Sequence, residues 1–167
     1  RRQNAEIDAI INNTATPTFE NTIVPYEKSG ELLQRVNTVF GNLLSAETSD
    51  ELQELAREIM PLMSEHENNI SLNEKLFARI KAVYELTDKN KLTPEQSKLL
   101  EDIYTGFVRN GANLQGDAKE KYRSLCKELS LLTLQFSENA LKETNDYQLA
   151  LTDKSQLSGL PESAVDA

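Results

Sequence analysis

Residues 117–144 read DAKEKYRSLCKELSLLTLQFSENALKET, and we expect the rest of the chain to be organised around this stretch. Its apolar side chains recur every three or four positions, which places them in one stripe along an α-helix. Such a helix would be roughly 40 Å long at 1.5 Å per residue. We therefore predict that it is the spine of a helical bundle. The stripe consists of Tyr122, Leu125, Leu129, Leu132 and Phe136.

A spine helix should bury its stripe and contact neighbours on more than one side. Leu131, Leu134 and Leu141 lie off the stripe and would need a second partner. Replacing a buried leucine by alanine costs roughly 2–5 kcal/mol, and we expect a loss of this size for Leu129→Ala. Cys126 lies beside the stripe, where the sequence favours a buried core thiol.

The composition limits the classes of function. The 167 residues can bury a core without disulfides, and 27 acidic against 18 basic side chains give a formal charge of −9. An acidic chain is a poor ligand for nucleic acid, and no apolar run is long enough to span a membrane, so we expect neither partner. The single cysteine cannot form an internal disulfide, which favours the cytoplasm and leaves a periplasmic or exported parent open.

Helix start signals divide the rest of the chain. In the clearest one, Thr93 caps, Pro94 takes the first helical position and Gln96 completes a capping box. We expect an all-α, multi-helix bundle of about six helices with more than about 70% helix. Further caps are predicted at Thr18, Thr48, Ser71 and Asp117, and breaks near residues 15–17, 47–49, 70, 89–93 and 112–116.

Prolines and the end of the chain complete the predicted organisation. We expect one helix from Phe19 to Ala46, bent at Pro25 and Gly30, and a second bend at Pro61. After residue 145, Tyr147, Leu149 and Leu151 alternate with other residues, a weak strand signal with no neighbouring strand to pair with. The predicted domains are a helical N-terminal domain, 1–145, and a partial connection, 146–167.

No residue pattern predicts catalysis or a bound metal in this chain. A helical zinc peptidase site needs His-Glu-x-x-His, but the sequence after His66 and Glu67 reaches Ile70 at the fifth position. A helix should end near Asn110 and Gly111, where glycine permits a left-handed terminus. Arg109 and Asn110, at this end, are the candidate substrate-channel residues, because they could bind a peptide backbone or a carboxylate. The structural alternative is a helix C-terminus with a cation placed favourably against the helix dipole.

Several segments of the chain, in order and covering nearly its whole length, resemble the N-terminal region of bacterial peptidyl-dipeptidases. These enzymes belong to the thimet oligopeptidase-like family of zinc metallopeptidases. The Phe-Glu-Asn-Thr sequence at Phe19–Thr22 favours the peptidyl-dipeptidase branch over the oligopeptidase branch. The matching segments are Pro17–Ile23, Glu27–Gly30, Arg35–Phe40, Asn42–Leu43, Leu72–Ile80, Phe107–Ala112 and Leu157–Pro161.

The resemblance implies the N-terminal helical domain of a clam-like metallopeptidase, whose deep channel admits short unstructured peptides. In that family a His-Glu-x-x-His helix and a further Glu hold one zinc, and peptidyl-dipeptidases release dipeptides from the peptide C-terminus. These residues lie beyond the present sequence, so we expect a fragment that alone binds no zinc and is inactive. Its partner would be the missing C-terminal catalytic half. The alternative is a self-contained helical interaction module without catalytic activity.

Overall fold

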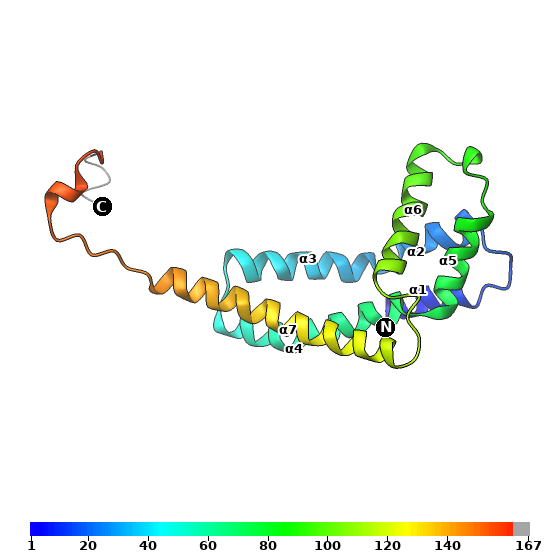
Figure 1. Cartoon of the computed structure of the whole chain (residues 1–167), viewed down its shortest axis with the longest axis horizontal. Helices are drawn as coiled ribbons and strands as arrows, with labels where there is room; N and C mark the ends of the chain where they lie inside the picture. Colours follow the sequence, from blue (N-terminus) through cyan, green and yellow to red (C-terminus); the bar gives the residue numbers. More distant parts are fainter. Residues whose placement is uncertain (162–167) are drawn as a thin grey trace. The chain divides into compact units, whose positions relative to one another are not determined.

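The computed structural model describes residues 1–161 and confirms the all-α prediction (Figure 1). The described residues are 77% helical, and no strand occurs among them. The α-helices are α1 (Arg2–Ile11), α2 (Val24–Lys28), α3 (Glu31–Ala46), α4 (Asp50–Ser71), α5 (Glu74–Leu86), α6 (Pro94–Arg109) and α7 (Asp117–Asp146). Short helical turns are η1 (Phe19–Ile23), η2 (Lys89–Lys91) and η3 (Lys154–Leu157).

The core lies where α1, η1, α5 and α6 meet. The ring of Phe77 stacks on Tyr104 and on Phe107, with 6.0 Å between centroids in both pairs, and Tyr26 meets Phe107 edge-on at 5.3 Å. Aromatic pairs in such arrangements add to the free energy of burial. The buried cluster is Ile7, Ile10, Phe19, Ile23, Leu76, Phe77, Ile80, Val83, Leu100, Ile103 and Phe107.

Arg79 of α5 fastens the loop between α1 and η1 to this core. One guanidinium nitrogen donates to the backbone carbonyls of Asn13 at 2.6 Å and Ala15 at 3.3 Å. The other donates to the Asn21 side chain at 3.3 Å and the Thr22 hydroxyl at 3.4 Å. The planar fork of arginine can hold several acceptors at once, so a single side chain fixes a loop that has no helical hydrogen bonds of its own.

The helix predicted from Phe19 to Ala46 is wrong as one element, because the structure divides it into η1, α2 and α3. Its first turn, η1, is a π-helix, and Pro25 lies in the first turn of α2, where its missing N–H costs no hydrogen bond. The division before α3 occurs at Gly30, whose φ of 75° lies in the left-handed region that favours glycine. At Pro61, by contrast, α4 continues without a break.

The predicted caps were right at those helix ends where only one nearby residue could act as the cap. Thr18 and Thr93 form capping boxes with Asn21 and Gln96, and α6 ends in a left-handed Gly111, as predicted. Three other predictions were wrong. Ser49 caps α4 instead of Thr48, Asn73 caps α5 instead of Ser71, and the Gly116 carbonyl accepts from the first turn of α7, in which Asp117 is already helical.

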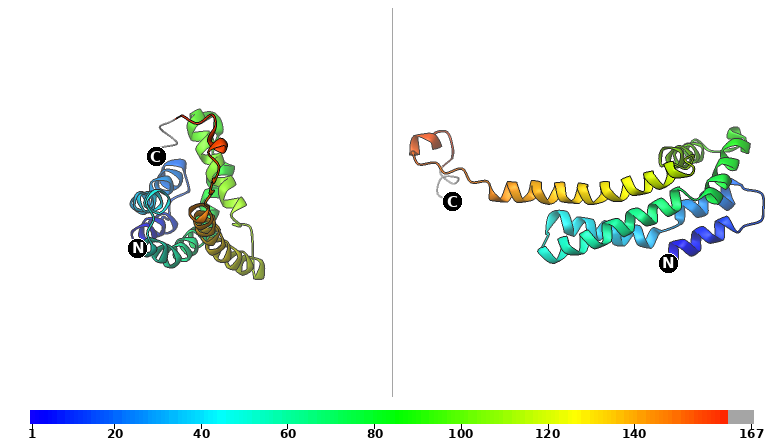
Figure 2. Two further views of the ribbon diagram at one scale, coloured as in Figure 1. Left: turned by 90° about the vertical axis from the view of Figure 1, so that its left-hand side faces the viewer. Right: turned by 60° about the horizontal axis from the view of Figure 1, so that its bottom comes forward.

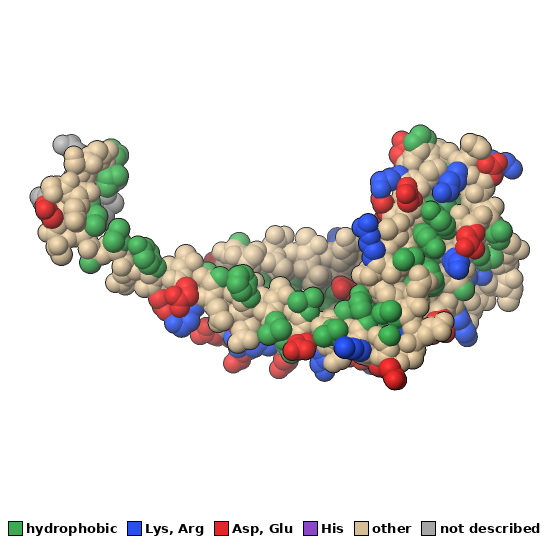
Figure 3. Space-filling model, viewed as in Figure 1, with side chains coloured by type: hydrophobic (Ala, Val, Ile, Leu, Met, Phe, Trp, Pro, Cys, Tyr) green, Lys and Arg blue, Asp and Glu red, His purple; other side chains and the backbone are tan. Residues whose placement is uncertain are grey.

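The helix predicted to begin at Asp117 forms as α7. The prediction that it is the buried spine of the bundle is wrong. None of its described residues is buried, and Leu129 and Phe136 are 63% and 74% exposed. Figure 3 shows the apolar side chains along its first half lying open on the surface. The prediction failed because helical periodicity identifies an apolar face without identifying what covers it, and the core here is made by α5 and α6 instead.

The chain divides into two compact units, residues 1–134 and 135–167. Within the first, α3 and α4 form an antiparallel pair, and the beginning of α7 lies beside α4 in both views of Figure 2. The described part of the second unit holds the end of α7, η3 and a turn after Leu157, while residues 147–151 form no strand. The predicted domain boundary at 145 stays a prediction. Residues 162–167, the last residues of the predicted connection, lie outside the described part of the chain.

Two matched leucine substitutions test this assignment of the core. Leu76→Ala, at a position with 0% exposure, should lower the free energy of unfolding by about 2–5 kcal/mol, because it leaves a cavity. Leu129→Ala should change it by no more than about 0.5 kcal/mol. Urea unfolding followed by circular dichroism gives both values. Equal losses would show that α7 is packed against the core.

The contacts of Arg79 predict that a substitution which keeps its positive charge will still lower the stability. Arg79→Lys keeps the charge but cannot reach all four acceptors, so we expect a loss of about 1–3 kcal/mol of stability. Arg35→Lys, at an exposed position of α3, is the matched control and should have little effect. Urea midpoints of the two variants make the comparison. If both variants unfold like the unchanged chain, Arg79 does not hold the loop.

Candidate functional site

A hollow of about 730 Å³ lies in the first unit. Its walls come from α1, from α2 and α3 around their junction, from α4, from the end of α6 and from the first half of α7. Its volume lies within the range of ligand sites. Four serines and several apolar side chains line it, and Glu67 is the only lining residue with a formal charge. Five carboxamides also face it, those of Gln3, Gln34, Asn37, Asn68 and Asn110.

A small cluster joins α1 to α4 at one end of the hollow. His66 Nε2 lies 2.7 Å from Gln3 Oε1, so these two side chains share a hydrogen bond. Gln3 also covers Gly30, because a Cβ at position 30 would lie 2.3 Å from its amide nitrogen. Glycine at this turn therefore serves both the left-handed backbone and the close approach of Gln3. Its backbone N–H donates to Glu6 Oε2 at 2.9 Å.

The carboxyl of Glu6, which belongs to this cluster, has a lowered pKa. The hydrogen bond from the Gly30 backbone lowers the pKa of its carboxyl below the usual 4.5, and the Arg2 side chain lowers it further. The Arg2 Nε to Glu6 Oε1 distance is 3.1 Å. The carboxylate form of Glu6 is thus the form that ties α1 to the start of α3.

On the opposite wall, α7 contributes Tyr122 and Cys126. Burial raises the pKa of Tyr122, and a side-chain hydrogen bond with Cys126 raises it further. Cys126 is half-buried on the wall of the hollow, so its predicted place in a core was wrong for the same reason as that of its helix.

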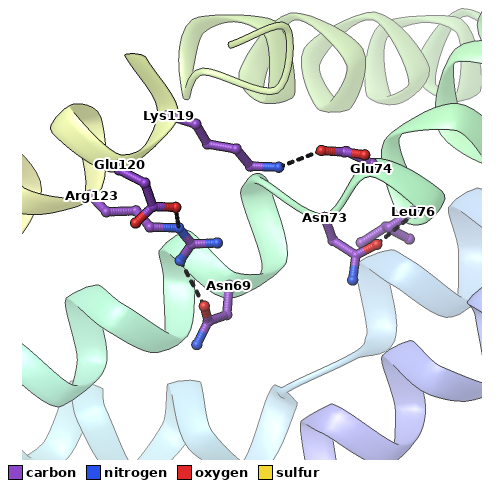
Figure 4. A network of polar contacts seen from close by, with 7 residues as sticks. All are labelled: Asn69, Asn73, Glu74, Leu76, Lys119, Glu120 and Arg123. Carbon is purple, nitrogen blue, oxygen red and sulfur yellow. Dashed lines mark hydrogen bonds and ion pairs between the residues drawn. The ribbon is translucent and has the colours of Figure 1, made fainter. Parts of the chain in front are cut away.

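Polar contacts hold the first turns of α7 to the junction of α4 and α5 (Figure 4). Lys119 Nζ lies 2.8 Å from Glu74 Oε1, and Arg123 Nη1 donates to Asn69 Oδ1 at 2.7 Å. Arg123 also lies 3.8 Å from Glu120 on its own helix. The hydrogen bond from Lys119 and its charge lower the pKa of the Glu74 carboxyl. We call the Lys119–Glu74 and Arg123–Asn69 contacts the α7 latch.

The structure separates the two predicted channel residues. Asn110 lines the hollow, whereas Arg109 is exposed and does not line it. His66, which the sequence analysis did not predict to bind a metal, is half-buried and hydrogen-bonded to Gln3. No group of three or more His, Cys, Asp or Glu side chains in the described residues could hold a metal ion.

Other lining residues were missed by sequence reasoning. Gln3 and His66 are 63 positions apart, and Asn68 is a buried amide that a helical pattern would assign to a polar face. No local motif connects these positions, because the hollow forms only when five segments of the chain come together. None of the helices in residues 1–161 is both long and apolar enough to cross a membrane.

Comparison with known proteins gives the family. The sequence profile of the neurolysin/thimet oligopeptidase N-terminal domain matches residues 2–119, and the chain belongs to this family. The family predicted from the matching segments is therefore confirmed.

Among relatives, the chain is 39% identical over 165 residues to the dipeptidyl carboxypeptidase of Escherichia coli (strain K12), which covers 99% of this chain and 24% of that protein. Identity to the dipeptidyl carboxypeptidase of Salmonella typhimurium is 37% over 160 residues, covering 96% of this chain and 24% of the relative. For oligopeptidase A of Escherichia coli it is 30% over 164 residues, with coverage of 96% and 24%. The chain thus spans about a quarter of the length of these curated relatives.

The carboxylate of Glu6 predicts an acid-sensitive part of the stability. Because its folded pKa is lowered, its contribution is present above the unfolded value of about 4.5 and is lost as the pH falls through the folded pKa. In Glu6→Gln, the difference between the thermal midpoints at pH 7 and at about pH 3 should therefore be smaller than in the unchanged chain. Asp8→Asn, an exposed position on α1, is the control and should leave this difference as it is. An unaltered difference in Glu6→Gln would contradict the assignment.

Proposed function

We propose that this chain is the N-terminal domain of a zinc metallopeptidase that acts on short unstructured peptides and releases dipeptides from their carboxyl ends. The observation that carries the proposal is the match along nearly the whole chain to dipeptidyl carboxypeptidases, at higher identity than to oligopeptidase A. The name of those relatives describes removal of dipeptides from a carboxyl end. For the parent we propose the cytoplasm, which the single cysteine favours.

In the parent, the domain would form one wall of the substrate channel. The hollow between α3, α4 and α7 supports this role, because its carboxamides and hydroxyls can donate to and accept from a peptide main chain. Its lining is almost without formal charge. Such a lining suits the neutral peptide backbone, which all peptides share, better than it suits a charged side chain of one particular peptide. Such a surface would bind substrates with little preference for sequence.

Asn110 and Arg109 are the proposed contacts at the end of α6. Asn110 lies on the wall of the hollow, where its amide can donate to one peptide carbonyl and accept from one N–H. Arg109, exposed beside it, offers a planar fork for a carboxylate. The family resemblance does not assign either role, so both rest on geometry and side-chain chemistry.

The zinc that the family implies does not fit the residues of this chain. A catalytic zinc usually takes three protein ligands. The ring of His66 shares a hydrogen bond with Gln3, and the Cys126 side chain shares one with Tyr122. We therefore derive no catalytic step from these residues and propose that the zinc ligands belong to the C-terminal catalytic half of the parent.

An interaction module without catalytic activity is the second candidate. The observation in its favour is the open apolar stripe of α7, which would suit a helical partner as well as a catalytic half. A His-Glu-x-x-His segment downstream in the same reading frame would establish the peptidase, and a reading frame without it would favour the module.

The proposed function predicts different results for the chain and for its parent. The chain alone should carry no stoichiometric zinc after chelator-free purification and dialysis, and should not cleave a blocked tripeptide. The parent should release the dipeptide in a chelator-sensitive reaction. Stoichiometric zinc or chelator-sensitive cleavage by the chain alone would overturn the proposal.

Variants of the parent test the channel contacts. Asn110→Ala should raise KM about twofold to tenfold with little change in kcat, because it removes a hydrogen bond to the bound peptide. Asn113→Ala, an exposed position in the following loop, is the matched control and should leave both constants unchanged. A KM for Asn110→Ala equal to that of the control would remove Asn110 from the channel.

A further inference from the structure

The first half of α7 is attached to the rest of its unit in an unusual way. Lys119 and Arg123 carry formal charges, yet their side chains are only 15% and 28% exposed. Their charged ends reach Glu74 and Asn69 at the junction of α4 and α5. No residue of α7 within the described chain is buried, and these polar contacts join its first turns to α4 and α5.

The link before α7 can act as a hinge. Gly111, with φ of 83°, reverses the chain after α6, and its close neighbours Leu72 and Leu114 fix that end. Gly116, with φ of 53°, precedes α7 and has open space around it. A positive-φ glycine in open space can change its backbone angles at little cost, so a small rotation there would swing the helix.

Movement of α7 would change the hollow directly. Tyr122, Cys126, Leu129 and Ser130 form its α7 wall. They follow Lys119, the first latch residue of α7, by about one to three helical turns. The opposite walls are held to one another by the Gln3–His66 and Gly30–Glu6 hydrogen bonds. The hollow therefore has one wall that depends on the latch and others that do not.

We propose that Lys119 and Arg123 are positioning residues whose contacts with Glu74 and Asn69 set the width of the hollow, with Gly116 as the hinge. When the latch is closed, α7 covers the hollow. When it is released, α7 turns about the hinge and the hollow widens. This proposal concerns residues 1–134 and does not depend on peptidase activity, so it can fail or succeed independently of the proposed function.

The single cysteine provides the measurement. Cys126 lies on the moving wall, and its rate of alkylation by N-ethylmaleimide reports how often that wall opens. Glu74→Gln removes the charge that Lys119 binds without altering α7. We expect its alkylation rate to be about twofold to fivefold higher than that of the unchanged chain, as for the loss of an exposed ion pair. Salt at about 1 M should raise the rate of the unchanged chain toward that of the variant.

Glu85→Gln is the control, because Glu85 is also on α5 and pairs with Lys81 of the same helix, so its loss removes a charge without touching α7. It should leave the rate unchanged. The charge-reversed pair Glu74→Lys with Lys119→Glu should restore the original rate, which separates the pair from either residue alone. A Glu74→Gln rate equal to that of the unchanged chain or of Glu85→Gln would overturn the proposal.

Hydrogen exchange distinguishes local opening from global loss of stability. In Glu74→Gln, amides of residues 117–134 should exchange faster while those of α6 keep their protection. If α6 also exchanges faster by the same factor, the variant unfolds the whole unit and the latch has no separate role.

Discussion

The guanidinium of Arg79 is the interaction on which the arrangement of the first unit depends. It binds backbone carbonyls after α1 and side chains of η1, two segments that have no ladder of hydrogen bonds between them. By fixing where η1 begins, it also fixes where α2 follows and where Gly30 meets Glu6. One side chain of α5 therefore determines the position of a wall of the hollow that it does not itself line.

Local chemistry made the helices predictable. Thr18, Thr93 and Gly111 were identified correctly, because a capping box or a left-handed glycine depends on a few adjacent residues. The caps at Thr48 and Ser71 were wrong by one and two residues, because Ser49 and Asn73 are equally good caps close by. Local sequence limits such a boundary to a few positions, and the packing of the following helix selects among them.

Burial and the site depend on contacts that are distant in sequence. The stripe of α7 has the same periodicity as the buried faces of α5 and α6, so pattern alone could not show that it lies open. Asn110 could be proposed from the sequence because the end of a helix is recognisable there, and the structure places this residue on the wall of the hollow. Gln3 and His66 were not found, because their pairing exists only after α1 packs beside α4.

The open surface of α7 has a consequence for how the sequence can vary. Because α7 contributes no buried side chain to the core, the residues of α7 and those of the core do not have to fit one another in packing. Each set can therefore change with little effect on the other. Selection on Leu125, Leu129 and Leu132 must then come from whatever molecule or domain lies against them. Among homologues, we expect substitutions along this face to be matched by changes in that partner rather than by changes in α5 or α6.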